Sequence, residues 1–282
     1  MLKAFALALT FGIVAPAHAQ DDWAKIRKEW NQPVAPFTIV GNVHYVGTAG
    51  IAAYLITTPE GHILIDGAME ESAAQVAANI EALGYKLGDV RILLVNHAHW
   101  DHSGGLAELK RRTGARLLAS AGDRPGLEAG KLDYRPDLDA APPVKVDGLI
   151  VDGEKIALGG SALTTHLTPG HTKGCTSWTM RADGLDLLFA CSITVADQPL
   201  VRGKGYDAAA ADFRATFAKL KGLRADIFLN FHPSGFGMEA KRKKLLAGDK
   251  RAFVDPGELP RQVRTAEAGF EAELKRQNAA SR

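Results

Sequence analysis

The sequence has few cysteines and no long apolar run after its first residues. Only two cysteines, Cys175 and Cys191, occur among 282 residues, which excludes a disulfide-dense scaffold. They fall in consecutive predicted strands, so the sequence leaves open whether they form a disulfide or remain free thiols. Beyond the N-terminus no segment approaches the ~20 apolar residues of a transmembrane helix. We therefore expect no membrane span.

Charge of neither sign dominates. The 34 lysines and arginines nearly balance the 32 aspartates and glutamates, so no general field attracts nucleic acid or an anionic membrane. The basic run at residues 241–244 is short and is interpreted as the solvated face of a helix. A Gly-Xaa-Ser-Xaa-Gly elbow is absent, which argues against a serine hydrolase. A small neutral or anionic substrate is the better expectation.

The N-terminus is typical of an export signal. Lys3 precedes the apolar residues 4–14, and Ala17-His18-Ala19 offers a small-residue cleavage site. We therefore expect residues 1–19 to be a signal peptide, residues 20–282 to form one domain, and the mature protein to be periplasmic. The sequence does not fix the oligomeric state, for which a monomer is our expectation.

Strand-like runs interrupted by single helices predict an α/β fold. Apolar residues three or four apart predict a helix at residues 73–83, and the wholly apolar residues 92–95 are typical of a strand covered on both faces. Further helices are expected at about 105–112, around 213–220 and from 259 onward. Further strands are expected at 37–46, 51–58, 62–65, 116–119, 154–158, 162–167, 176–180, 186–191 and 226–231. This order predicts an αββα sandwich, with two sheets face to face and helices outside.

The strongest functional signal is a cluster of metal-binding residue types directly after residues 92–95. Residues 97–102 read His-Ala-His-Trp-Asp-His, so three imidazoles and one carboxylate lie within six residues. Zinc prefers these ligands when cysteine is absent. Because all four groups cannot easily converge on one tetrahedral ion, the spacing indicates two metals. The alternative is a solvated loop, which rarely gathers so many imidazoles at ligand spacing.

Two further histidines stand where strands are expected to end. His171 lies in a Thr-Pro-Gly-His-Thr turn, and His232 directly follows an apolar strand. Together with the cluster they complete two three-ligand sites, each with an open position. Of the remaining histidines, His44 and His62 are interpreted as structural residues within strands. For His166, a structural role and a role in supporting a metal ligand both stay open.

At these residues the sequence resembles the metallo-β-lactamase superfamily, whose hallmark is the His-Xaa-His-Xaa-Asp-His run. The resemblance extends over essentially all of the chain after the signal. It implies an αββα sandwich of two mixed β-sheets, with two Zn²⁺ ions in the groove between them. Carried over by position, it assigns the first zinc to His97, His99 and His171 and the second to Asp101, His102 and His232. Catalysis is expected to depend on Asp101, which would orient the attacking water, and on His171.

The end of the strand at residues 186–191 narrows the substrate class. Many members of the superfamily that are not lactamases carry there an aspartate that bridges both metals, and this chain has Ser192 instead. The serine and the histidines at both metals resemble the third subclass of class B β-lactamases. Residues 45–48, 64–67 and 168–172 agree with that subclass. Cys191 departs from the residues common at its position, and residues 196–206 match no familiar substrate-binding pattern.

The resemblance implies a hydrolase that opens the β-lactam ring of penicillins, cephalosporins and carbapenems by attack of a zinc-bound hydroxide. Ser192 and Thr194 are expected to bind the substrate carboxylate or the site water, with a structural role as the alternative. Asp66 is expected to hydrogen-bond the ligand loops or to cap a helix. A thioester or lactone hydrolase of the same superfamily, and a periplasmic metal-binding protein without activity, stay open as alternatives.

Overall fold

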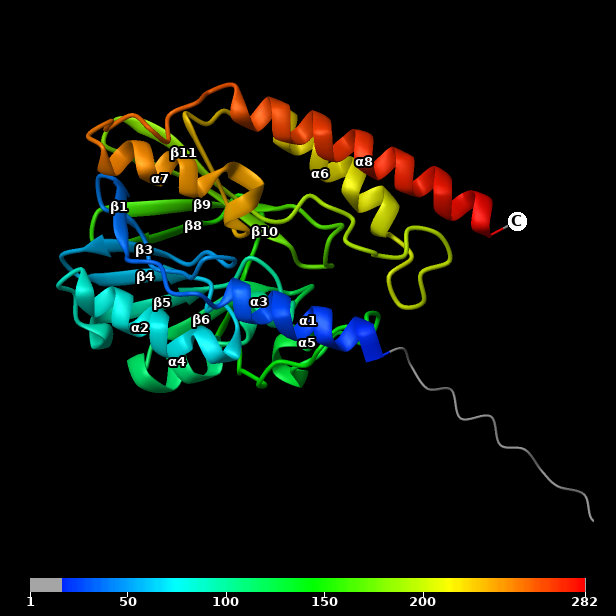
Figure 1. Cartoon of the computed structure of the whole chain (residues 1–282), viewed down its shortest axis with the longest axis horizontal. Helices are drawn as coiled ribbons and strands as arrows, with labels where there is room; N and C mark the ends of the chain where they lie inside the picture. The colour runs from blue at the N-terminus through cyan, green and yellow to red at the C-terminus, as the bar shows by residue number, and fades with distance from the viewer. Residues whose placement is uncertain (1–16, 282) are drawn as a thin grey trace, which may run out of the picture.

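Two β-sheets lie face to face at the centre of the computed structural model, which describes residues 17–281 (Figure 1). The first sheet has seven strands in the order β1-β2-β3-β4-β5-β6-β7. Its strands are β1 (Phe37–Val40), β2 (Val43–Tyr45), β3 (Tyr54–Thr58), β4 (Gly61–Ile65), β5 (Val90–Leu94), β6 (Arg116–Ser120) and β7 (Gly148–Ile150). Strands β1 to β4 form an antiparallel meander, whereas β4 to β7 are parallel, so the sheet is mixed.

The second sheet has five strands in the order β12-β11-β10-β9-β8. Its strands are β8 (Lys155–Leu158), β9 (Ser161–Leu167), β10 (Thr176–Ala182), β11 (Leu185–Ala190) and β12 (Ile227–Asn230). Only β11 and β12 pair in parallel, so this sheet is mixed as well. Strand β4 and the second half of β11 are wholly buried, because side chains cover them on both faces.

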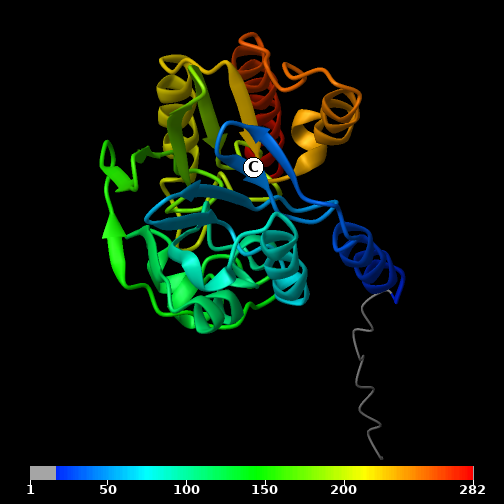
Figure 2. The same ribbon diagram turned by 90° about the vertical axis from the view of Figure 1, so that its left-hand side faces the viewer.

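Helices cover the outer face of each sheet, which confirms the predicted αββα sandwich (Figures 1 and 2). Helices α2 and α4 lie on the side of the first sheet, and α6, α7 and α8 lie on the side of the second. The α-helices are α1 (Ala17–Trp30), α2 (Ala73–Ala82), α3 (Trp100–Ser103), α4 (Leu106–Thr113), α5 (Arg124–Ala129), α6 (Ala209–Lys221), α7 (Met238–Leu246) and α8 (Glu258–Ala280). Short 3-10 turns are η1 (Glu70–Ser72), η2 (Leu87–Asp89) and η3 (Pro233–Phe236).

The predicted helical stripes bury the residues that define them. Phe213 and Phe217 on α6 meet Phe270 on α8, with ring centroids 5.4 and 5.6 Å apart. Val76 and Ile80 of α2 are fully buried. Burial of large apolar side chains at this spacing is what fixes a helix against a sheet or a neighbouring helix.

Some elements differ from the sequence-based expectation. The run at residues 37–46 is two strands, because Gly41 takes the left-handed conformation at φ 52° and turns the chain. Helix α5 and strand β7 lie in the segment between the strands expected at 116–119 and 154–158, for which the sequence predicts neither element. Helix α5 has a proline in its first turn and ends at Gly130, which is left-handed at φ 71°. Both signals are local, but the Gly- and Pro-rich composition of the segment obscured them.

The predicted signal peptide lies mostly outside the described residues. The described chain begins within α1, whose first residues are Ala17 to Ala19. Within residues 17–281, none of the helices combines the length and the apolar character that a bilayer span requires.

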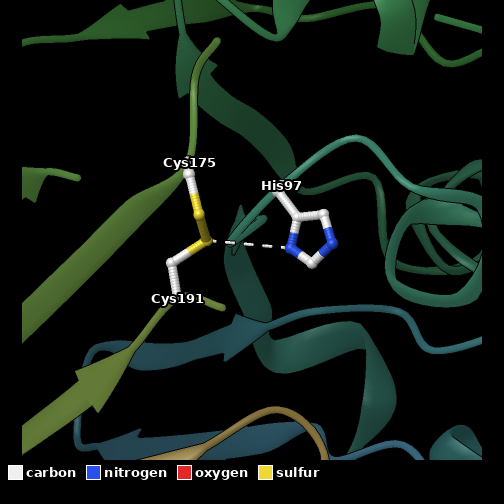
Figure 3. A group of neighbouring side chains, drawn as sticks. All are labelled: His97, Cys175 and Cys191. Carbon is white, nitrogen blue, oxygen red and sulfur yellow. Dashed lines mark hydrogen bonds between the residues drawn. A yellow bond between two sulfur atoms is a disulfide. The ribbon is translucent and has the colours of Figure 1, made fainter. Parts of the chain in front are cut away.

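Cys175 and Cys191 form a disulfide, with their Cα atoms 5.9 Å apart. The bond joins the loop before β10 to the end of β11, and both cysteines are fully buried. Figure 3 shows the bond beside the ring of His97, whose Nδ1 lies 3.7 Å from Cys191 Sγ. Because the two sulfurs are bonded to each other, they are not thiolate ligands for a metal. The alternative left open by the sequence is thereby resolved.

Replacing both cysteines, Cys175→Ala with Cys191→Ala, should lower the free energy of unfolding. The cysteines are 16 residues apart in sequence, and closing a loop of that length contributes about 3 kcal/mol. Denaturant unfolding of the metal-free protein measures the change. A reductant should destabilise the wild type and leave the double variant unaffected. Equal unfolding midpoints for wild type and double variant would contradict the expectation.

Candidate metal centre

The cluster at residues 97–102 lies at the end of β5, where the chain leaves the buried sheet and enters α3. Close backbone packing holds this turn. A Cβ atom on Gly105 would lie 2.2 Å from the carbonyl oxygen of Gly67. The Gly-Gly pair after the cluster therefore lets the turn approach the segment that follows β4. As a result, the side chains of His97, His99 and Asp101 are buried at the junction of the two sheets.

His97, His99 and His171 form a first triad. One ring nitrogen from each lies within 4.8 Å of the others. His171 comes from the loop between β9 and β10, and its Nε2 lies 3.1 Å from Nδ1 of His99. Three imidazoles from two segments far apart in sequence therefore converge on one point.

Asp101, His102 and His232 form a second triad. Oδ2 of Asp101 lies 3.3 Å from Nε2 of His102 and 3.5 Å from Nε2 of His232, and the two nitrogens are 3.2 Å apart. A tetrahedral zinc ion with bonds of ~2.0–2.1 Å holds its ligand atoms about 3.3 Å apart. The second triad therefore has the dimensions of three corners of a zinc tetrahedron.

In His97 and His171, a hydrogen bond at Nδ1 fixes which ring nitrogen carries the proton. Nδ1 of His97 donates to Oδ1 of Asn96, and Nδ1 of His171 donates to the carbonyl oxygen of Thr194 at 2.8 Å. In each ring this leaves the lone pair of a neutral imidazole on Nε2. Nε2 of His97 is buried and has no hydrogen-bond partner among the described residues. A buried acceptor without a donor is costly, and a metal ion would satisfy it.

Asp66 performs the same task for His102. Nδ1 of His102 donates to Oδ2 of Asp66 at 3.0 Å, and Asp66 also accepts the backbone N–H of Asn96 at 2.8 Å. Asp66 is fully buried and left-handed at φ 68°, a conformation that costs a non-glycine residue free energy. The side chains of Asp66, Asn96 and His102 form one hydrogen-bonded network behind both triads. Sequence reasoning singled out Asp66 but missed Asn96, whose only signal is its place directly before the cluster.

Burial sets the protonation of the histidines. It lowers the pKa of His171 and of His232 to about 4, with neighbouring imidazoles as a lesser cause. Burial and the adjacent imidazoles also hold the pKa values of His97 and His99 well below the ordinary range. These four rings are therefore neutral at pH 7 and offer the lone pairs that metal binding requires.

Two buried carboxyl groups, Asp66 and Asp101, favour positive charge at the centre. Burial lowers the pKa of His102, but Asp101 and Asp66 outweigh it and raise the pKa to about 10. Burial raises the pKa of Asp101, but His102 and the other histidines outweigh it and hold the pKa below the ordinary range. Four neutral imidazoles, the ionised Asp101 and a protonated His102, whose proton a metal would replace, fit divalent metal ions. The residues present therefore suit the metals that the sequence predicts.

The two triads open into a cavity of about 410 Å³, a size suited to a small molecule. Ser192 and Thr194 line it, and their hydroxyl oxygens are 3.0 Å apart. Trp30 at the end of α1 also lines it and meets the ring of His232 edge-on, with centroids 5.3 Å apart. Arg135 lines it too, from the segment before β7. Sequence reasoning missed Trp30 and Arg135, because neither belongs to a local motif.

Of the histidines after the predicted signal peptide, three lie outside the triads. His44 is hydrogen-bonded to Thr38 and Thr57, and burial lowers its pKa to about 4. Nε2 of His166 is 2.8 Å from Oγ1 of Thr179 on the neighbouring strand. The third, His62, is buried within β4. The structural interpretation therefore accounts for the contacts of all three.

Asp123 ties the two ligand loops together. Its carboxylate accepts the backbone N–H of Ala98 and the hydroxyl of Thr172, both at 2.9 Å, and the backbone N–H of Gly174 at 2.9 Å. A Cβ atom on Gly174 would lie 2.4 Å from the nitrogen of Asp123, so glycine permits this approach. The loop that carries His97 and His99 and the loop that carries His171 thus share one buried anchor. No sequence motif predicts this role of Asp123.

Comparison with known proteins identifies the class to which this fold and centre belong. The family model of the Metallo-beta-lactamase superfamily matches residues 46–232, a span that includes both triads. The chain belongs to this superfamily, and it is a metallo-hydrolase.

Within the superfamily the chain is similar to solved structures of subclass B3. BJP-1, a subclass B3 metallo-beta-lactamase of Bradyrhizobium japonicum, is 42% identical with a TM-score of 0.86, over 91% of this chain and 99% of that chain. FEZ-1, a metallo-beta-lactamase from Legionella gormanii, is 37% identical with a TM-score of 0.84, over 88% of this chain and 98% of that chain.

Curated sequences give a different name. A hydroxyacylglutathione hydrolase of Acidiphilium cryptum is 33% identical over 150 residues, which is 53% of this chain and 53% of that protein. A second, from Anaeromyxobacter dehalogenans, is 35% identical over 121 residues, 43% of this chain and 38% of that protein. The chain thus spans about half the length, or less, of the curated relatives it matches.

Asp123→Ala should weaken metal binding without removing a ligand. The loss frees both ligand loops, and removal of a group that orients metal ligands costs about 10- to 100-fold in affinity. Competition of Zn²⁺ with a chelating indicator measures the affinity. Asp147→Ala is the matched control, because Asp147 also accepts a backbone N–H, from Leu117 at 2.9 Å, but lies outside the ligand loops. Equal losses in both variants would contradict a specific role for Asp123.

Proposed function

We propose that the chain is a zinc-dependent hydrolase that opens the β-lactam ring of penicillins, cephalosporins and carbapenems. The observation that carries the proposal is the pair of adjacent triads in a fold that matches subclass B3 structures over nearly their whole length. The proposed partner is therefore a small β-lactam, with no role for nucleic acid. Together with the predicted signal peptide, the proposal implies a periplasmic enzyme.

His97, His99 and His171 would hold one Zn²⁺, and Asp101, His102 and His232 a second. Zinc bound there would supply Lewis acidity and a nucleophile at neutral pH. The rings of His97, His171 and His102 each donate a hydrogen bond from Nδ1, to Asn96, Thr194 and Asp66 respectively. These bonds keep the Nε2 atoms of the three rings aimed at the centre. The protein therefore presents its ligands without having to reorganise them.

The chain's own residues orient the reactants. Asp101 stays ionised because the histidines around it hold its pKa low, so its carboxylate can accept a proton in a hydrogen bond from the attacking water. Ser192 and Thr194 offer two hydroxyl groups on the cavity wall, suited to donate to a substrate carboxylate. Trp30 and Trp100, which also line the cavity, add aromatic surface to its wall.

A thioester hydrolase is the second candidate, and the curated relatives favour it by name. Ser192 favours β-lactam hydrolysis instead. It lies two residues after the end of β11 and lines the cavity, at the position where many non-lactamase members carry a metal-bridging aspartate. A serine hydroxyl lacks the charge to bridge two cations. We therefore place β-lactam hydrolysis first.

Purified protein should hydrolyse nitrocefin, a penicillin and a carbapenem faster than S-lactoylglutathione or an acyl-homoserine lactone. A chelator should abolish this activity and added Zn²⁺ should restore it, because the ligand sets offer no other nucleophile-activating group. Spectrophotometric rates with each substrate measure the preference. Rapid thioester turnover without β-lactam turnover would refute the assignment and support the second candidate.

Asp101→Ala and His171→Ala should each reduce kcat/KM by about 10³-fold or more while the fold persists. Each variant removes one ligand of a centre expected to stabilise the transition state by several kcal/mol. His166→Ala is the matched histidine control and should retain activity, since its contact is with Thr179. Circular dichroism and zinc content accompany the rates. Near-native turnover by either ligand variant with zinc present would show that its assigned role is wrong.

A further inference from the structure

Arg135 is a buried cation in the wall of the cavity. Its side chain is only 4% exposed. Among the described residues that line the cavity, it is the only lysine or arginine. The other charged lining residues are the carboxylates Asp101, Asp137, Asp139 and Asp197. Without Arg135, this wall would repel an anionic substrate.

The contacts of Arg135 leave part of its guanidinium available. Nε and Nη2 donate to the carboxylate of Asp137 at 2.9 and 2.7 Å, and Nη1 donates to the carbonyl oxygen of Ala196 at 3.3 Å. An arginine has five N–H groups. The contacts with described residues engage three of them and leave one on each terminal nitrogen. The two contacts also fix the plane of the guanidinium between two loops.

Asp137 is a partner that an incoming anion can replace or share. Its side chain is 57% exposed, whereas that of Arg135 is 4% exposed, so water and an incoming anion reach this ion pair from the side of Asp137. Asp139 has a different partner, since its carboxylate lies 2.7 Å from Nη1 of Arg27. The charge of Arg135 is therefore held in place by a partner whose carboxylate is open to solvent and can move aside.

The neighbours of Arg135 complete a carboxylate site. Nη1 binds the carbonyl of Ala196, two residues after Thr194, so the guanidinium adjoins the loop that carries the Ser192 and Thr194 hydroxyls. All three side chains line the same cavity. A planar guanidinium beside two hydroxyls matches the paired oxygens of a carboxylate, because arginine binds that group in a two-pronged manner.

We propose that Arg135 is the specificity-determining residue of this cavity and binds the carboxylate of the substrate, with Asp137 as the partner that it exchanges. The inference rests on the proposed function, because it places the scissile bond at the triads and the carboxylate at the wall. It extends that function to a substrate class: small acyl compounds that carry a carboxylate away from the bond that breaks.

Ligand pairs that differ only in this charge test the proposal without any hydrolysis. The probes are ω-mercaptoalkanoates of three to six carbons and the matching primary amides, whose thiol anchors on zinc. Their affinities for the zinc-loaded protein are measured by isothermal titration calorimetry. The wild type should bind at least one acid about 10- to 100-fold more tightly than its amide, the range for a charge-assisted hydrogen bond.

Three variants separate recognition from structure. Arg135→Gln should remove the preference for the acid and leave the affinity for the amide unchanged, whereas Arg135→Lys should retain part of the preference. Asp137→Asn should increase the preference, because it removes the competing carboxylate. If Arg135 only joined two loops, Arg135→Gln would weaken acid and amide equally, and that result would overturn the proposal. Equal affinity of the wild type for acid and amide at every chain length would also overturn the proposal, and so would the absence of binding by both.

The result is independent of which substrate is hydrolysed. A carboxylate preference that Arg135→Gln removes, found in a protein inactive on β-lactams, would uphold Arg135 and overturn the proposed function. If the protein hydrolyses β-lactams but its preference for the acid persists in Arg135→Gln, the proposed function would be upheld and the role of Arg135 overturned. The kinetic counterpart is a cephalosporin and its methyl ester. Arg135→Gln should raise KM for the free acid by about 10- to 100-fold and leave KM for the ester unchanged.

Discussion

The burial of two carboxylates among five imidazoles is the constraint on which the rest of the structure depends. An unpaired ion away from water costs several kcal/mol, so burial acts to raise the pKa values of Asp66 and Asp101, and positive charge beside them opposes this. His102 supplies it as a proton-bearing ring between them, which is why its pKa is raised to about 10. A divalent cation compensates the same charge and leaves the ring neutral, so protons and metal compete for one position. Metal affinity and the stability of this part of the fold are therefore coupled.

The scaffold meets this constraint by joining loops rather than by strengthening any one of them. The ligands come from the ends of β5, β9 and β12, which lie in different sheets. Asp123 hydrogen-bonds both the loop that carries His97 and the loop that carries His171. The disulfide joins the second of these loops to the end of β11, beside His97 (Figure 3). Each link spans segments that are distant in sequence. The rigidity of the centre is thus a property of tertiary contacts, as expected where strand ends carry function.

The sequence predicted the parts of the centre that have a chemical signature and missed those that have only a position. Three histidines and an aspartate within six residues point to metal whatever surrounds them. His171 and His232 became candidates because turn residues marked the ends of their strands. Asn96, Asp123 and Arg135 are single polar residues without local spacing, and their roles arise from contacts such as that between Asp123 and Gly174. The layers of the fold followed from periodicity, whereas α5 was hidden in a Gly- and Pro-rich segment and β7, with three residues, is too short to show a period.

Beyond the bridging position that Ser192 occupies, substrate choice depends on the cavity wall. Two zinc ions polarise a lactam, a thioester or a lactone by the same physics, so identical triads suit all three bonds. What differs is where the rest of the molecule can rest. In this chain the wall beside the triads combines Ser192, Thr194 and Arg135, which favour a planar anion held at a fixed distance from the metals. A bicyclic β-lactam carries its carboxylate on a rigid ring, whereas a glutathione thioester carries its charges on flexible arms. The rigid molecule loses less conformational entropy on binding to such a wall, and this difference supports the proposed β-lactam substrate over a thioester.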